Sequence, residues 1–326
     1  MAAVLATMAL VGSAGAQAAT LKATGSGFSY NGTASDSDLT IAVAGTSLVF
    51  TDAGETSFTR ALPAGCSAVA VEAGISATCS APGARTIVLN LDAGDDWVYA
   101  ADLPRRISLV ADLGHGMNVM ESGAGADIIS AGSGADTLYG GPGNDVVSGG
   151  GGFDYVRGNG GNDVLSGGTD FDFVLGDGGT DVISGGASFD YLFGGGGNDV
   201  IDGGADFDTI RGGGGDDRIS GGPGDDEIYG GKGQDNMDGG AGDDLLRARD
   251  GESDTINCGG GTDIARVDAG EIDQAKRSCE TVKQVDATTA EPEDEDGVET
   301  DDGDGDDTAR AANAEKRQLR AHRTLR

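Results

Sequence analysis

An aspartate recurs every nine residues, without interruption, through the middle of this chain of 326 residues. Glycines precede each of these aspartates, and an aliphatic residue or methionine follows two positions later, as in residues 140–148. A fixed short period indicates a repeat architecture, in which each unit stacks on its neighbours instead of enlarging one globular core. The fourteen aspartates are Asp127, Asp136, Asp145, Asp154, Asp163, Asp172, Asp181, Asp190, Asp199, Asp208, Asp217, Asp226, Asp235 and Asp244.

The nine-residue unit predicts a coil of 18 residues, made of two units. Its glycine-rich part must turn, because glycine tolerates positive φ. The residues after the aspartate form a three-residue strand, whose middle side chain points inward. We therefore expect an all-β fold, a parallel β-roll (a β-solenoid), in which two thin parallel sheets enclose a narrow aliphatic core.

The rest of the chain divides around this array. Residues 20–121 carry short alternating apolar runs between Gly, Asn and Asp, which predicts a small N-terminal β region with degenerate repeats. Residues 122–247 form the array, and residues 248–285 form degenerate repeats and a cap stapled by cysteines. Residues 286–326 are acidic and then basic, and have too little apolar content to fold alone, which predicts a disordered tail.

The N-terminus favours export from the cell. Residues 1–11 are an apolar run, and small residues follow, with Ala16, Gln17 and Ala18 fitting a signal-peptidase site. We expect residues 1–19 to be a secretory signal peptide of an extracellular protein; the alternative is an alanine-rich disordered leader. The run is too short to span a bilayer, and no other segment is apolar enough to be transmembrane.

The four cysteines fall into two local pairs, Cys66 with Cys79 and Cys258 with Cys279. An even number in an exported chain indicates disulfides, and local pairing is the simplest of the three connectivities. Each pair flanks the array, where an end cap needs a staple. No Cys-x-x-Cys occurs and there are only two histidines, which argues against a structural zinc site.

A row of stacked carboxylates needs cations between its members. The formal net charge of −34 also argues against nucleic acid as a partner, since phosphate binding needs basic clusters. Calcium takes about six to eight oxygen ligands, which two stacked glycine-rich turns can supply through carbonyls and aspartates but one turn cannot. Magnesium fits less well, because it requires a tight octahedron and retains its water. We therefore predict calcium ions, Ca2+, bound by the fourteen repeat aspartates.

The repeat Gly-Gly-x-Gly-x-Asp-x-apolar-x, seen at residues 194–202 and 221–229, resembles the RTX, or hemolysin-type, calcium-binding repeat family. The resemblance covers residues 122–247 and implies a parallel β-roll that is poorly ordered without calcium. The flanks resemble small secreted bacterial repeat proteins. These have a strand-rich leader with a cysteine pair before the array, and an ending of the type Asn-Cys-Gly-Gly-Gly-Thr-Asp, here residues 257–263.

Alternate repeats lie on opposite edges of the coil, and the two edges differ. Edge A is the column that begins with Asp127, and edge B is the column that begins with Asp136. Glycine fills the fourth repeat position throughout edge A, whereas on edge B it becomes Asp170, Ser188 and Asp206 in three consecutive repeats. We infer an intact calcium column on edge A and a weakened or altered one through the middle of edge B. The alternative is that Asp170 and Asp206 act as replacement ligands.

Aromatic residues gather on edge B with the same period. They predict either a binding surface for a cell-surface or carbohydrate partner or cross-strand stacking that stiffens a glycine-rich coil, and we favour the stacking. The residues of this aromatic ladder are Phe153, Tyr155, Phe171, Phe173, Phe189, Tyr191 and Phe193.

Three functions follow from these patterns. The first is a secreted, non-enzymatic calcium-binding repeat protein whose array folds on binding calcium. The alternative is a calcium-stabilised adhesion module that uses the aromatic ladder. An enzyme ranks last, because the chain has no His-Glu-x-x-His and no Gly-x-Ser-x-Gly, and His115 is the only histidine before the tail. We predict no catalytic residue.

Overall fold

The chain folds as an all-β parallel solenoid with coils of 18 residues, which confirms the predicted fold class. The computed structural model describes residues 20–23, 27–31, 38–45, 47–52, 66–71, 74–80, 83–268, 274–275 and 278–285. These residues contain no helix, and therefore no helix that could cross a membrane. The predicted signal peptide and tail lie outside them. The chain forms two compact units, Met1–Gly150 and Gly151–Arg326.

Six strands precede the coils of the first unit. Hydrogen bonding between β1 and β2, β3 and β4, β4 and β6, and β5 and β6 is antiparallel. Next to the coils the pairing becomes parallel, between β2 and β7 and between β3 and β8. The antiparallel strands therefore cover the start of the coil stack, as a cap must. The six are β1 (Thr20–Ala23), β2 (Gly27–Asn31), β3 (Asp38–Ala44), β4 (Ser47–Asp52), β5 (Cys66–Val71) and β6 (Gly74–Ser80).

The coils of the first unit alternate between two sheets. One sheet holds β7, β9, β11 and β13 in that order, and the other holds β8, β10 and β12. Every consecutive strand along the chain thus changes sheet, as expected for a solenoid with two strands per coil. The strands are β7 (Thr86–Asn90), β8 (Trp97–Tyr99), β9 (Ser108–Asp112), β10 (Val119–Glu121), β11 (Ile128–Ser133), β12 (Thr137–Pro142) and β13 (Val146–Gly151).

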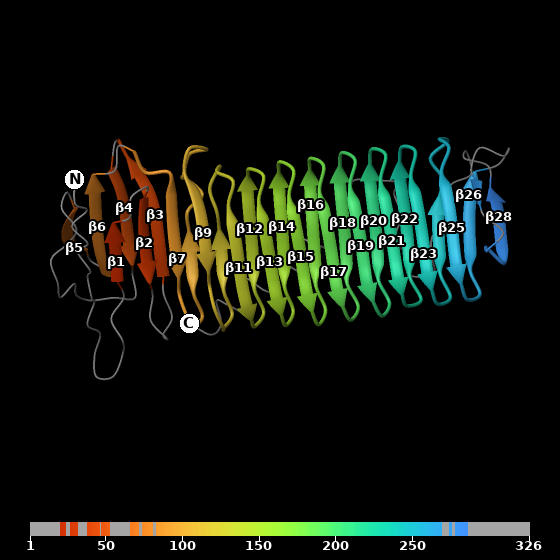
Figure 1. Cartoon of the computed structure of the whole chain (residues 1–326), viewed down its shortest axis with the longest axis horizontal. Coiled ribbons are helices and arrows are strands. Elements are labelled where there is room, and N and C mark those ends of the chain that lie inside the picture. The colour runs from red at the N-terminus through yellow and green to blue at the C-terminus, as the bar shows by residue number, and fades with distance from the viewer. Residues whose placement is uncertain are drawn as a thin grey trace. The chain divides into compact units, whose positions relative to one another are not determined.

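The second unit repeats this arrangement with a constant register. Each strand pairs with the strand one coil later, so that Val164 lies beside Val182, and Val182 beside Val200 (Figure 1). The strands are β14 (Tyr155–Gly160), β15 (Val164–Thr169), β16 (Phe173–Gly178), β17 (Val182–Ala187), β18 (Tyr191–Gly196), β19 (Val200–Ala205), β20 (Thr209–Gly214), β21 (Arg218–Pro223), β22 (Glu227–Lys232), β23 (Asn236–Ala241), β24 (Leu245–Ala248), β25 (Thr255–Gly260), β26 (Ile264–Asp268), β27 (Gln274–Ala275) and β28 (Thr281–Val285).

The inward aliphatic positions form the core as predicted. From Ile129 to Leu246, the residue two positions after each repeat aspartate is at most 2% exposed. The strands are longer than the three residues that we expected, because six-residue strands such as Val200–Ala205 continue through the glycine pair. Gly186 and Gly204 are paired in this ladder. The turn is correspondingly short, which brings the aspartates of successive coils close together.

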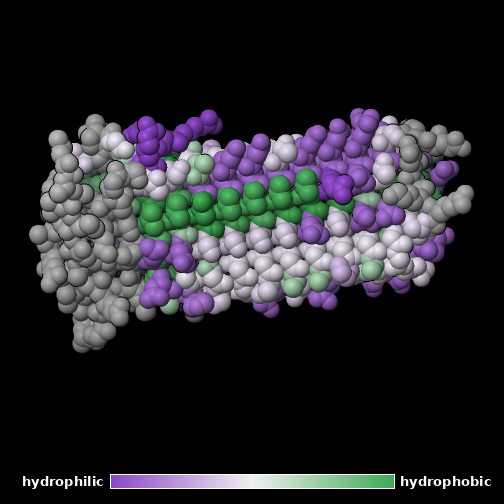
Figure 2. All heavy atoms as spheres, viewed as in Figure 1, coloured by the Kyte–Doolittle hydropathy of each residue, from purple (hydrophilic) through white to green (hydrophobic). Residues whose placement is uncertain are grey.

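Outward positions complete the alternation expected of a strand. The residue directly after the aspartate points to solvent in the sheet of β15, β17 and β19, where Val164, Val182 and Val200 are 43–46% exposed. Figure 2 shows apolar side chains gathered in one band on the face that it views. These β-branched residues suit a pleated surface even when exposed. The repeat aspartate, just before this position, is therefore held at the point where the chain enters the strand.

Candidate metal centre

The fourteen predicted site residues are all buried, with at most 2% of each residue exposed. In each pair of successive coils, the Oδ1 atom of one aspartate accepts the N–H of the aspartate one coil earlier. The N–H of Asp181 donates to Asp199 Oδ1 at 2.7 Å on edge A, and the N–H of Asp190 donates to Asp208 Oδ1 at 2.8 Å on edge B. In the first unit, the N–H of Asp127 donates to Asp145 Oδ1 at 2.7 Å. One carboxylate oxygen thus fixes the next coil.

The second oxygen, Oδ2, has no such partner in most of the second unit. A buried carboxylate oxygen without a hydrogen bond is costly, and a series of them calls for a missing ligand. The aspartates whose buried Oδ2 accepts no hydrogen bond are Asp172, Asp181, Asp190, Asp199, Asp208, Asp217, Asp226, Asp235 and Asp244.

A glycine five residues before each of these aspartates, at the first repeat position, leaves space beside the orphaned oxygen. A Cβ atom added to Gly194 would lie 2.5 Å from Asp199 Oδ2 and 2.5 Å from the carbonyl oxygen of Gly212, one coil later. The glycines from Gly167 to Gly239 place such an atom 2.3–2.6 Å from their own aspartate. A carboxylate oxygen and a carbonyl oxygen from successive coils therefore converge on one small space.

These donors fit calcium. Calcium takes oxygen ligands, and carboxylates and backbone carbonyls are its usual protein donors. Among the residues that the structure describes, no group of three or more His, Cys, Asp or Glu side chains is placed to hold a metal ion. The donor set therefore consists of a carboxylate from each repeat together with backbone carbonyls. The repeat aspartates and the glycines of the turns would hold the ion.

Burial raises the pKa of the repeat aspartates well above 3.8. The pKa rises to about 8 for Asp172, Asp208 and Asp217, and to about 7 for Asp190 and Asp244. Loss of hydration is the main cause, and neighbouring carboxylates add to it for all of these except Asp190. Near neutral pH these groups therefore need either a proton or a cation.

A second polar ladder runs beside the aspartates at the fifth repeat position. Asn162 Oδ1 accepts the N–H of Thr180 at 3.0 Å, and Asn198 Oδ1 accepts the N–H of Asp216 at 3.0 Å. On edge B, Asp225 Oδ1 accepts the N–H of Asp243 at 2.8 Å. In the middle of edge B, phenylalanine occupies this position, so ring stacking replaces the polar rungs.

The rings of the aromatic ladder stack on one another. Successive rings from Phe153 through Phe171 and Phe189 to Phe207 are each 5.1 Å apart, and Phe173 stacks on Tyr191 at 4.9 Å. These separations are those of favourable aromatic pairs. The geometry supports the cross-strand stacking that we favoured. Tyr155 is only 1% exposed, so its ring is not available to a partner.

The substituted turns of edge B keep the geometry of the others. Asp170, Ser188 and Asp206 adopt the left-handed conformation, with φ of 75°, 81° and 76°. The neighbouring Asp172 and Asp208 retain the Oδ1 hydrogen bond and the orphaned Oδ2 of the edge A residues. Asp170 and Asp206 also raise the pKa of these two aspartates by charge repulsion, after the larger effect of burial. The backbone of edge B is therefore unaltered.

The aspartate ladder extends beyond the fourteen predicted residues. Asn118 occupies a ladder position before Asp136, whose Oδ1 accepts the Asn118 N–H at 2.6 Å. The N–H of Asp235 donates to Asp254 Oδ1 at 2.8 Å. Asn118 lies 18 residues before Asp136, so extending the period would have found it. Asp254 comes 19 residues after Asp235, as the slip in phase indicated.

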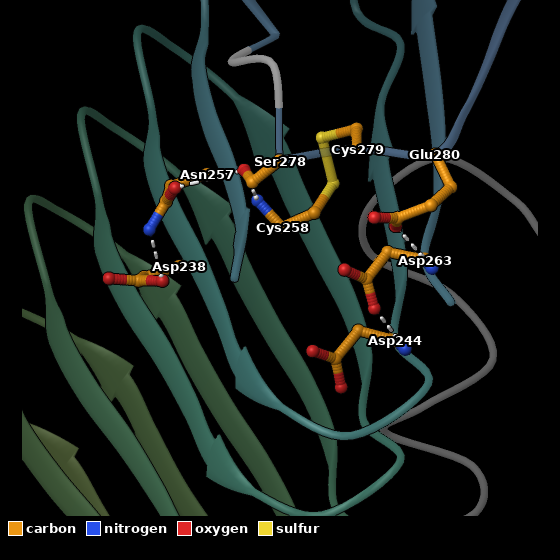
Figure 3. Close-up of a disulfide and its surroundings, with 8 residues drawn as sticks. All are labelled: Asp238, Asp244, Asn257, Cys258, Asp263, Ser278, Cys279 and Glu280. Carbon is orange, nitrogen blue, oxygen red and sulfur yellow. Dashed lines mark hydrogen bonds between the residues drawn. A yellow bond between two sulfur atoms is a disulfide. The ribbon is translucent and has the colours of Figure 1, made fainter. Parts of the chain in front are cut away.

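Glu280 is the last rung of edge B. The N–H of Asp244 donates to Asp263 Oδ1 and the N–H of Asp263 donates to Glu280 Oε2, both at 2.9 Å (Figure 3). Beside this rung, a disulfide joins Cys258 to Cys279 with an S–S distance of 2.04 Å, which confirms the pairing predicted for these two. No sequence signal identified Glu280, because it differs in residue type and in spacing.

The N-terminal cysteines lie opposite one another. Cys66 and Cys79 are register partners in the antiparallel pair of β5 and β6. Cys79 is disulfide-bonded, and the side chain of Cys66 lies outside the described residues.

The model of the RTX calcium-binding nonapeptide repeat family matches the chain in four copies, at residues 116–147, 139–174, 175–210 and 211–246. The match confirms the resemblance drawn from the repeat. No curated protein shows a significant match.

Proposed function

Residues 116–246 are RTX calcium-binding nonapeptide repeats, and from this premise we propose that the protein is a secreted, non-enzymatic calcium-binding protein whose array folds on binding calcium. The buried carboxylates with orphaned Oδ2 atoms carry the proposal. Bound calcium supplies positive charge and accepts electron pairs from these oxygens and from the carbonyls of the turns.

The energetics of burial support folding coupled to calcium. A carboxyl whose pKa rises from 3.8 to about 7, as for Asp190, costs the fold about 4 kcal/mol once it is ionised. A typical domain is stable by about 5–15 kcal/mol in total. A few ionised carboxylates without a cation therefore exceed that stability, and the array has many. The coils close at neutral pH only when the charge is compensated.

Export supports the same proposal. Residues 1–19 have the apolar run and small residues of a signal peptide. The Cys258–Cys279 disulfide suits an oxidising compartment. Metal binding and folding are coupled when the site does not exist in the unfolded chain, so calcium outside the cell would trigger folding after export.

A non-enzymatic role is proposed from the position of the titratable groups. The shifted pKa values belong to the repeat aspartates, which are buried between coils. His115 lies on an exposed turn, where its Nδ1 is 2.8 Å from Ser133 Oγ. A general base needs access to a substrate, and neither arrangement provides a site where a substrate meets such a group.

The test is a calcium titration of the full chain at pH 8, followed by circular dichroism, with magnesium as the control ion. We expect a cooperative rise in the β signal with calcium alone. Asp199→Asn should raise the calcium concentration at half-folding, whereas the matched control Asp202→Asn, on an exposed outward position of β19, should not. A chain that is already fully folded in chelator, and that binds no calcium, would overturn the proposal.

A further inference from the structure

The first repeat position is glycine only in the interior of the array. Glycine precedes by five residues each aspartate from Asp145 to Asp244. The repeats at the two ends break this rule. The residues at the first position are Ser122 before Asp127, Ala131 before Asp136, Arg249 before Asp254 and Cys258 before Asp263.

Ser122 shows what a side chain does at this position. Its hydroxyl donates a hydrogen bond to Asp127 Oδ2, and both residues are at most 2% exposed. The oxygen that is orphaned in Asp172 and Asp199 is thus satisfied in Asp127 by the chain itself. A hydroxyl group supplies the positive end of a dipole where the interior repeats leave a space.

The other three residues also put atoms into this space. At the interior glycines an added Cβ would lie 2.3–2.6 Å from the aspartate Oδ2, closer than atoms that are not bonded can approach. Ala131 has this Cβ and is 1% exposed. Cys258 has it too, is fully buried, and is fixed by its disulfide to Cys279. Arg249 adds a permanent positive charge.

We propose that these four side chains close the ends of both cation columns, so that calcium is confined to the repeats from Asp145 to Asp244. Asp127 and Asp136 then belong to the folded ladder but hold no ion. The inference rests on the proposed calcium binding and adds its limits. It also explains why the first position, which only needs to avoid a clash inside the array, changes at both ends.

The test removes the closing side chains and counts calcium. Ser122→Gly leaves Asp127 Oδ2 without its hydrogen bond and opens the space beside it. Ala131→Gly removes one methyl group beside Asp136 and no hydrogen bond, so it keeps the test sharp if the first variant is destabilised. Ser130→Gly, at an exposed outward position of β11, is the matched control. Bound calcium per chain is measured by native mass spectrometry and by equilibrium dialysis.

We expect one more ion per chain in Ser122→Gly, one more in Ala131→Gly, and no change in Ser130→Gly. The metal-free form of Ser122→Gly should also unfold at a lower urea concentration than the parent, and calcium should restore it. An unchanged count in both variants, with the parent binding calcium, would overturn this inference and leave the proposed function standing. A parent that binds no calcium would instead overturn the proposed function.

Discussion

Replacing Asp190 with asparagine separates the two roles of a repeat carboxylate. Asp190 Oδ1 accepts the N–H of Asp172 at 2.8 Å, and its buried Oδ2 has no hydrogen-bond partner. The amide of asparagine keeps the accepting oxygen and replaces Oδ2 with a neutral NH2 group. Asn118 already fills such a rung, accepting the N–H of Asp96 at 3.1 Å, so the fold accommodates the substitution.

The pH dependence of this variant follows from the raised pKa of Asp190. Burial raises that pKa from 3.8 to about 7. Between these values the folded metal-free chain keeps a proton that the unfolded chain has released, so its stability falls as pH rises through this window. The carboxyl costs nothing below pH 3.8 and about 4 kcal/mol well above pH 7. Asparagine does not titrate, so Asp190→Asn should gain about 4 kcal/mol relative to the parent between pH 4 and pH 9.

The assay is urea unfolding of metal-free protein between about pH 4 and pH 9, followed by circular dichroism. Asp202→Asn, which removes an exposed carboxyl, is the control and should give no comparable pH-dependent gain. In calcium the order should reverse, because the parent gains a ligand that the variant has lost. A stability difference between parent and Asp190→Asn that stays constant with pH, or that favours the parent increasingly as pH rises, would refute the reasoning.

Three further substitutions test the packing around the columns. Phe189→Ala removes a ring that contacts three others and should cost about 3 kcal/mol, whereas Phe207→Ala, at an end of the stack with 42% of the residue exposed, should cost about 1 kcal/mol; equal urea midpoints would contradict this. Ser188→Gly relieves a left-handed backbone with φ of 81° and should stabilise the protein by about 0.5–1 kcal/mol in thermal unfolding, so a lower melting temperature counts against it. Cys279→Ser opens a link across 21 residues and should cost about 3 kcal/mol locally, seen as faster hydrogen exchange around Cys258; unchanged exchange would show that the cap needs no staple.

The coil could be predicted from sequence because its period is short and strict. Each repeat places one aspartate and one aliphatic residue at fixed positions, and these determine which side chains are buried and how many strands each coil has. Strand length could not be predicted in this way. The glycines of Val200–Ala205 look like turn residues, but the ladder continues through them because the coil one step earlier offers matching backbone groups.

The candidate site was predictable where the period holds and not where it changes. The coil from Asp96 to Asn118 spans 22 residues, and the one from Asp235 to Asp254 spans 19, yet the ladder hydrogen bond forms in both. Register along the sheet, which sequence spacing alone does not give, decides these pairings. The hydrogen bond from Ser122 to Asp127 Oδ2 was also out of reach, because it depends on the direction of a side chain inside a turn.

The aromatic ladder lies where the columns are most strained by charge. Asp172 and Asp208 have pKa values of about 8, and Asp170 and Asp206 add repulsion beside them. An aromatic pair contributes about 0.5–1.5 kcal/mol beyond its burial, while ionised Asp172 costs about 6 kcal/mol. Several ring contacts are therefore needed to offset a single carboxylate. The ladder from Phe153 to Phe207 can hold these coils in register, but it leaves most of the charge to be compensated by a proton or a cation, as on edge A.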